Sequence, residues 1–263
     1  MSTNATETLP RLSDEELVKL LQVMKGVDSV ELKVTLPASE TRTVIRALDM
    51  DPVEAQPRQV FFFDTPDLAL NAAGVVVRAR RVQGGRGDTV IKLRPVVPEE
   101  LSAELRRQTA FNVEVDVIPG GFVCSASFKG RTTGQEIRGV VNGATPLRKI
   151  FSKEQRAFFA EHAPEGINLD GLTTLGPTFV LKLAFEPSVI GRRMVAELWF
   201  YPDGSRVFEL STKCLPSEAF QVAAEARAYL ASNGVKLGGE QATKTKTALE
   251  FFRDELKASA ATT

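Results

Sequence analysis

Hydrophobic and polar residues alternate with a period of two in eight separate stretches of the chain, and most of these stretches carry charge at the polar positions. This period is typical of β-strands whose two faces meet different environments. Residues 84–88 and 202–204 join neighbouring stretches as predicted hairpin turns, which favours a mainly antiparallel sheet. The predicted strands cover residues 29–36, 59–64, 75–80, 90–94, 111–117, 179–186, 193–200 and 208–213.

A helical spacing of apolar residues replaces this alternation in five places. Ser13 and Glu16 form a predicted capping box at the start of the first helix, which ends near Gly26. The other predicted helices cover 38–49, 153–161, 217–232 and the chain from 243 onward. We interpret 119–176 as an irregular insertion with short helices within a single domain at 28–250. Residues 1–27 are then a tail and a packing helix, and 251–263 are the end of the last helix and its tail.

Composition narrows the possible classes of function. The chain has 263 residues, 43% of them hydrophobic, with 33 Lys and Arg against 33 Asp and Glu, so no net field attracts bulk nucleic acid. The single histidine, His162, excludes zinc sites and catalytic triads that need two histidines. Cys124 and Cys214 form no CxxC motif, and no apolar stretch is long enough to span a membrane. We expect a reduced, cytoplasmic protein without a membrane partner.

The kind of charge on the strands is the main functional signal. Arg78, Arg80, Lys92 and Arg94 lie at alternate positions of two consecutive predicted strands. A solvated sheet face is the ordinary interpretation of polar alternate positions, but so dense a set of cations repels itself unless anions compensate it. Acidic residues occupy the equivalent positions of other strands, at Glu31, Glu114, Asp116, Glu197 and Glu209. Closing the sheet would bring both sets together around a lumen, where a polyanion and its divalent metal would fit.

Several short motifs, in order along the chain, resemble those of the CYTH superfamily, the triphosphate tunnel metalloenzymes. Ser29-Val30-Glu31-Leu32-Lys33 is similar to the first-strand signature Glu-x-Glu-x-Lys. The resemblance covers about 28–250, and its further elements are Phe63-Asp64-Thr65-Pro66-Asp67-Leu68, Leu70, Gly74, Arg78-x-Arg80, Lys92-x-Arg94, Glu114-x-Asp116, Lys182, Glu209-x-Ser211-x-Lys213 and a terminal Thr245-Lys246. We therefore identify the chain as similar to a divergent CYTH member.

The resemblance implies an α+β fold, namely a closed barrel of eight antiparallel strands that forms a tunnel with flanking helices. It implies a metal-dependent hydrolase that takes inorganic triphosphate or an organic triphosphate together with Mg²⁺ or Mn²⁺. Phosphate oxygens would be bound by Lys33, Arg78, Arg80, Lys92, Arg94, Lys182 and Lys213. Metal would be held by Glu31, Glu114, Asp116 and Glu209, of which Glu31 and Glu209 would be the catalytic pair.

Two departures from the family pattern keep other functions open. Ser29 and Ser211 stand where the family has metal-side carboxylates, and serine is a poor ligand for a divalent cation. The protein could be an enzyme that uses one metal, or one in which Glu186 or Glu197 substitutes for a missing acid. It could instead be a tunnel that binds polyphosphate or nucleotide without turnover, or a protein with adenylate cyclase-like chemistry.

Overall fold

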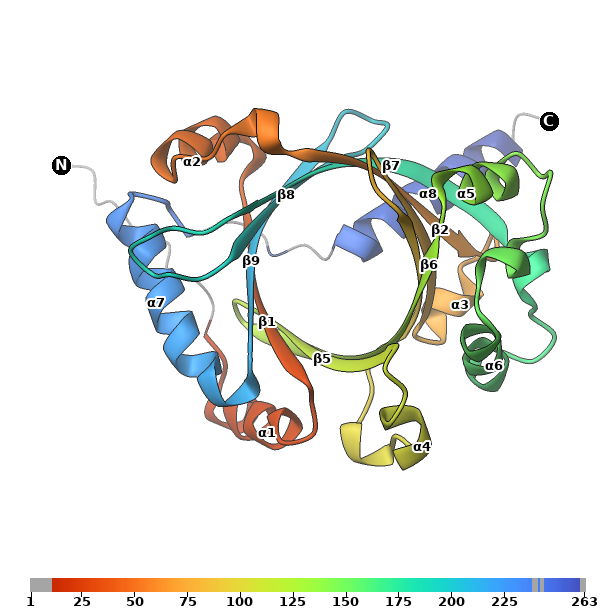
Figure 1. Ribbon diagram of the computed structural model, residues 1–263, viewed down its shortest axis with the longest axis horizontal. Helices are drawn as coiled ribbons and strands as arrows, with labels where there is room; N and C mark the ends of the chain where they lie inside the picture. Colours follow the sequence, from red (N-terminus) through yellow and green to blue (C-terminus); the bar gives the residue numbers. More distant parts are fainter. Residues whose placement is uncertain (1–10, 238–240, 242–243, 261–263) are drawn as a thin grey trace.

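Nine strands form a closed barrel in the computed structural model, which describes residues 11–237, 241 and 244–260 (Figure 1). The strands follow each other around the barrel in the order β1-β5-β6-β4-β3-β2-β7-β8-β9, and β9 pairs with β1 to close it. Their bounds are β1 Ser29–Leu36, β2 Gln56–Asp64, β3 Val75–Val82, β4 Gly87–Leu93, β5 Phe111–Ile118, β6 Gly121–Thr132, β7 Thr173–Phe185, β8 Met194–Phe200 and β9 Arg206–Cys214.

The predicted closed barrel with flanking helices is confirmed, but the prediction of eight antiparallel strands is wrong. The additional strand is β6, which lies inside the segment interpreted as an irregular insertion. Its interior positions begin with Ser125 and Ser127, which are small and uncharged, so the charged alternation that marks the other strands appears there only at Lys129 and Arg131. The barrel is also mixed, because β1 pairs parallel to β5 while it pairs antiparallel to β9.

Helices surround the barrel, as Figure 1 shows. The predicted capping box of the first helix is confirmed, since the backbone N–H of Glu16 donates to Oγ of Ser13 at 3.2 Å. Leu20 and Met24 of that helix are buried against the outside of the barrel. The helices are α1 Asp14–Met24, α2 Thr41–Ala47, α3 Ala69–Ala72, α4 Ala103–Arg106, α5 Gly134–Val141, α6 Lys153–His162, α7 Ala219–Ser232 and α8 Lys244–Ala260. None of those in the described part of the chain is long and apolar enough to cross a lipid bilayer.

A buried glutamine fixes α6 against the barrel wall. The side-chain amide of Gln155 donates to the carbonyl oxygens of Thr89 at 3.3 Å and Phe128 at 3.1 Å. A Cβ atom at Gly130 would lie 2.4 Å from Oε1 of Gln155, so only glycine leaves room for this contact. The interaction holds β4 and β6 together, and these strands carry Lys92 and other cations of the interior.

The last helix differs from the others because it packs against residues that face the barrel interior. Figure 1 shows α8 beginning within the outline of the barrel. Its residues Ala248, Leu249 and Phe252 are buried in one apolar cluster with Val60 and Val180. Those two valines also line the interior cavity, so α8 forms part of the wall that encloses it.

Candidate functional site

The barrel encloses a charged cavity of about 650 Å³. Twelve lysines and arginines line it against five aspartates and glutamates. Of the eleven residues predicted as site residues, ten line this cavity: Glu31, Lys33, Arg78, Arg80, Lys92, Arg94, Glu114, Asp116, Lys182 and Lys213. The remaining one, Glu209, is buried beside it and bonds to a lining lysine. The strand period therefore did select one interior face, as the sequence indicated.

The parallel pairing of β1 with β5 brings the acidic positions together. In this register Ser29 lies opposite Glu114 and Glu31 lies opposite Asp116. On its other side, β1 places Glu31 opposite Lys213 of β9. Acidic side chains from strands far apart in the sequence thus meet on one wall of the cavity.

Three carboxylates form a compact cluster on this wall. One oxygen from each of Glu31, Glu114 and Asp116 lies within 4.8 Å of the other two. The Lys33 ammonium lies 3.1 Å from Glu31 and 3.0 Å from Asp116. Burial alone would raise the pKa of Glu31 and of Asp116, but Lys33 lowers both. Glu31 and Asp116 are therefore ionised at neutral pH, and the oxygen donors of the cluster fit a hard divalent cation such as Mg²⁺ or Mn²⁺.

Ser29 is a poor metal ligand itself, but it contacts one carboxylate of this cluster. Its hydroxyl donates to Oε2 of Glu114 at 3.2 Å. The ammonium of Lys213 also binds that oxygen. Ser29 therefore orients one carboxylate of the cluster at the position where the family signature has its first glutamate.

A second acidic group lies elsewhere in the interior and already has a cation. The Lys244 ammonium, at the first residue of α8, lies 2.5 Å from Glu197 and 2.6 Å from Glu209. Lys182 contacts Glu197 at 3.3 Å, and the indole N–H of Trp199 donates to Glu197 at 3.1 Å. Burial opposes ionisation of Glu197, yet Lys244 and Lys182 lower its pKa well below the usual range.

Of the two acids proposed to substitute for a missing carboxylate, Glu186 and Glu197, only one lies in the cavity. Glu197 lines the cavity, whereas Glu186 is exposed and does not. Ser211 itself is buried and lies opposite Lys33. It supplies no carboxylate on the same face of the strand as Glu209. Glu209 instead pairs with Glu197 through Lys244, apart from the three-carboxylate cluster. The side chain of Lys246, assigned to the terminal motif, lies outside the described residues.

The opposite part of the cavity wall holds cations that have no carboxylate partner among the described residues. Within that part of the chain, the Nε atom of Arg78 is buried and has no hydrogen-bond partner, and the same is true of Nε of Arg58. Burial and the neighbouring Arg80 lower the pKa of Arg78 to about 10, so its guanidinium stays charged at neutral pH. A buried polar group without a partner is costly, and an anion in the cavity would satisfy it.

Several charged residues that line the cavity were not among the predicted site residues. They are Arg58, Asp88, Lys129, Arg131, Arg193 and Lys244. Arg58 and Arg193 continue the parity of strands that were predicted, so their alternation could have revealed them. Lys129 and Arg131 belong to β6, whose strand character the sequence did not indicate. Lys244 begins a helix, where the strand period gives no information.

Comparison with known proteins supports the fold. No protein-family model and no curated protein matches the sequence. A candidate adenylyl cyclase from Hippeastrum with a dominant triphosphatase activity matches with a TM-score of 0.62 and 16% identity, over 87% of this chain and 96% of that one. A candidate adenylate cyclase from Bacillus halodurans matches with a TM-score of 0.57 and 13% identity, over 84% and 96%. The chain thus has the same fold as these two solved structures.

Proposed function

We propose that this protein is a divalent-metal-dependent hydrolase of a short triphosphate, inorganic or organic, bound inside the barrel. One observation carries the proposal: cations with no carboxylate partner in the described part of the chain, among them Arg78, share the barrel cavity with a compact cluster of three carboxylates. Such a cavity has groups for phosphate oxygens on one wall and groups for a hard cation on the other.

The residues divide the work according to their charge. Arginines form paired hydrogen bonds with phosphate oxygens, and this is the role we assign to Arg78, Arg80 and Arg94. Lysines of the cavity supply point charges for the same phosphate chain, namely Lys33, Lys92, Lys182 and Lys213. Their combined excess over the carboxylates offsets the charge of a triphosphate.

Glu31, Glu114 and Asp116 would hold Mg²⁺ or Mn²⁺. When bound, the metal neutralises phosphate charge and lowers the pKa of water. We assign catalytic roles to Glu31, within this cluster, and to Glu209, which forms an ion pair with Lys244 on the other side of the interior. Phosphoryl transfer depends mainly on positioning and charge stabilisation, so the lack of histidine and cysteine among the cavity-lining residues is compatible with it.

Two further observations favour hydrolysis over the alternatives. The three-carboxylate cluster is complete despite Ser29, which supports metal-dependent turnover rather than binding alone. A nucleoside would need an aromatic or apolar surface beside the phosphates, but the indole of Trp199 is covered by Lys244, whose ammonium lies 5.2 Å from the ring centre. The Hippeastrum protein of the same fold has a dominant triphosphatase activity, which agrees with this choice.

The test is phosphate release from tripolyphosphate, ATP and thiamine triphosphate by purified protein with Mg²⁺ or Mn²⁺. We expect release from at least tripolyphosphate, its loss with a chelator, and a loss of more than a hundredfold in Glu31→Gln, with tripolyphosphate binding retained by calorimetry. Glu54→Gln, at an exposed glutamate outside the barrel interior, is the matched control. Absence of turnover with every substrate and both metals, in protein that binds tripolyphosphate, would refute the hydrolase.

A further inference from the structure

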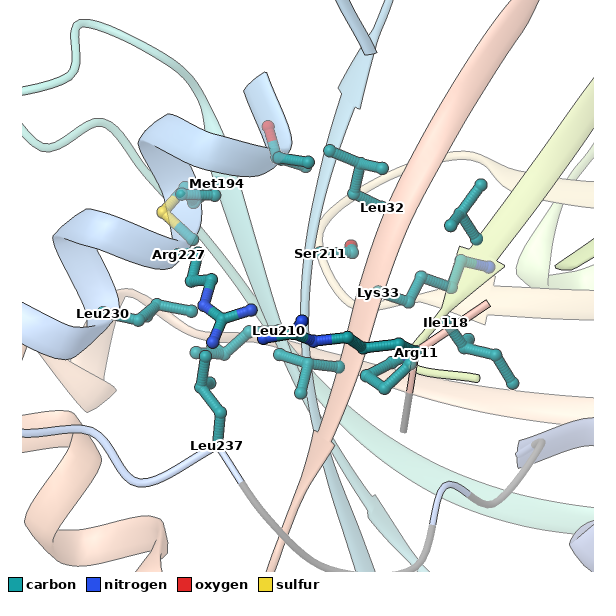
Figure 2. A pocket seen from close by; sticks show the side chains of 16 residues that line it. Arg11, Leu32, Lys33, Ile118, Met194, Leu210, Ser211, Arg227, Leu230 and Leu237 are labelled. Atoms are coloured by element: carbon teal, nitrogen blue, oxygen red, sulfur yellow. The ribbon is translucent and has the colours of Figure 1, made fainter. Parts of the chain in front are cut away.

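A second cavity, of about 240 Å³, lies outside the barrel between α7 and the strands β1 and β9 (Figure 2). It is separate from the charged interior of the barrel, although Lys33, Ser211 and Thr212 belong to the lining of both. The wall between the two cavities is therefore a single layer of strand.

The lining of this outer pocket is mostly aliphatic. Leu32 and Leu210 come from positions that alternate with the charged interior residues, so their side chains face outward. Met194 and Leu230 continue the apolar surface, and both belong to the cluster that holds α7 on the barrel. Leu32 and Ile118 remain partly exposed, which leaves apolar surface open to solvent inside the pocket.

Two arginines stand over this apolar surface. Figure 2 shows the guanidinium groups of Arg11 and Arg227 directed toward each other beside Leu210. Within residues 11–237, 241 and 244–260, neither arginine forms an ion pair with a carboxylate. Both arginines are exposed, so water screens much of their mutual repulsion, but their converging guanidinium groups offer paired donors to an anion held between them.

We propose that the outer pocket binds an amphiphilic carboxylate, a single aliphatic chain that ends in a carboxyl group. The chain would cover the leucines and Met194, and the carboxylate would accept hydrogen bonds from Arg11 and Arg227. Both halves are needed: arginines alone would accept any anion, and an aliphatic pocket alone would accept a neutral or cationic chain equally well. Inorganic phosphate and tripolyphosphate lack the apolar half and belong to the barrel interior.

The experiment is calorimetric titration of the full-length protein with decanoate below its aggregation threshold. Octanoate, decyltrimethylammonium and inorganic phosphate serve as comparison ligands. We expect decanoate to bind more tightly than octanoate, by up to about fourfold for each added methylene. Decyltrimethylammonium, which has the opposite charge, and inorganic phosphate, which has no chain, should not compete.

The double variant Arg11→Ala/Arg227→Ala should weaken decanoate binding at least tenfold. Arg42→Ala/Arg138→Ala removes two exposed arginines elsewhere and should leave it unchanged. Thermal unfolding and tripolyphosphate binding to the interior show that each variant is folded, and they keep this result independent of the proposed activity. Equal binding of decanoate and decyltrimethylammonium, no effect of the double arginine variant, or no decanoate binding at all would overturn the proposal.

Discussion

The Lys244 ammonium lies 2.6 Å from Oε1 of Glu209, and this contact joins the first residue of the C-terminal helix to a strand of the barrel interior. The same ammonium reaches Glu197, so a single lysine compensates two buried carboxylates. Ser211 stands where an acid was expected, and the remaining acid of that strand, Glu209, lies next to an internal cation. The arrangement accounts for the separation of Glu209 from the three-carboxylate cluster.

Replacing Lys244 by methionine should destabilise the protein by about 3 to 5 kcal/mol, because two buried carboxylates lose their counterion. The free energy of unfolding in urea at pH 7 measures the loss. Adding Glu197→Gln and Glu209→Gln to the Lys244→Met protein should restore part of it. Equal stability of Lys244→Met and the unaltered protein would contradict the proposed compensation.

Replacing Arg78 by alanine should weaken tripolyphosphate binding by about 10- to 100-fold, as expected when one charged hydrogen-bonding partner is removed. Stability without ligand should be unchanged or higher, because the buried Nε of Arg78 has no hydrogen-bond partner to lose. Calorimetry and urea unfolding report the two effects separately. Arg42→Ala, at an exposed helical position, is the control. A loss of stability together with unchanged binding would give Arg78 a structural role instead.

Replacing Ser29 by glutamate should raise the affinity for Mn²⁺ by roughly tenfold, because a fourth carboxylate joins the cluster. The same change should lower stability without metal, since like charges are brought together. Mn²⁺ titration by calorimetry tests the first effect and thermal unfolding the second. Ser29→Ala, which removes only the hydroxyl that donates to Glu114, should change Mn²⁺ affinity much less. Unchanged affinity in Ser29→Glu would place the metal away from this wall.

The pH dependence of stability should include a contribution from Glu197. Burial opposes its ionisation, but Lys244 and Lys182 lower its pKa well below 4.5, so the unfolded state binds its proton more readily than the folded state. This contribution is present above the unfolded pKa and is lost as pH falls toward the folded one. Urea unfolding between pH 7 and pH 3 should therefore show a shallower acid loss in Glu197→Gln. Identical pH profiles would show that the ion pair does not stabilise the fold.

The period of the strands predicted most of this site, because a closed barrel sends every second residue to one interior. Once Glu31 and Lys33 were assigned to one face of a strand, the parity of other strands placed Arg78 and Asp116 on the same side. What the period could not give was the pairing of β1 with β5. That pairing depends on contacts between residues far apart in the chain, and it is what gathers Glu31 and Asp116 into one cluster.

Two misses have different physical causes. The interior of β6 carries Ser125 and Ser127, whose small side chains alternate with apolar residues but lack the charge that marks the other strands. For the terminal helix, the sequence does not show which residues point into the barrel, because successive side chains are rotated by about 100° around the helix axis. Sequence similarity selected Thr245-Lys246; the structure brings Lys244 to the carboxylates and Thr245 to the cavity lining, while the side chain of Lys246 lies outside the described residues. The packing of Leu249 and Phe252 fixes this rotation of the helix.

The pairing of the first strand sets the order in which the barrel can close during synthesis. β1 is flanked by β5, which ends at Ile118, and by β9, which ends at Cys214. A growing chain that has left the ribosome only as far as β8 therefore exposes one edge of β1 with no strand to cover it. Closure by such distant segments makes folding slow, and the unpaired edges are exposed to association until β9 arrives. The helix α1 shares an apolar cluster with Val30 of β1, but it also packs against β6, so its binding surface on the barrel is complete only after β6 has been made.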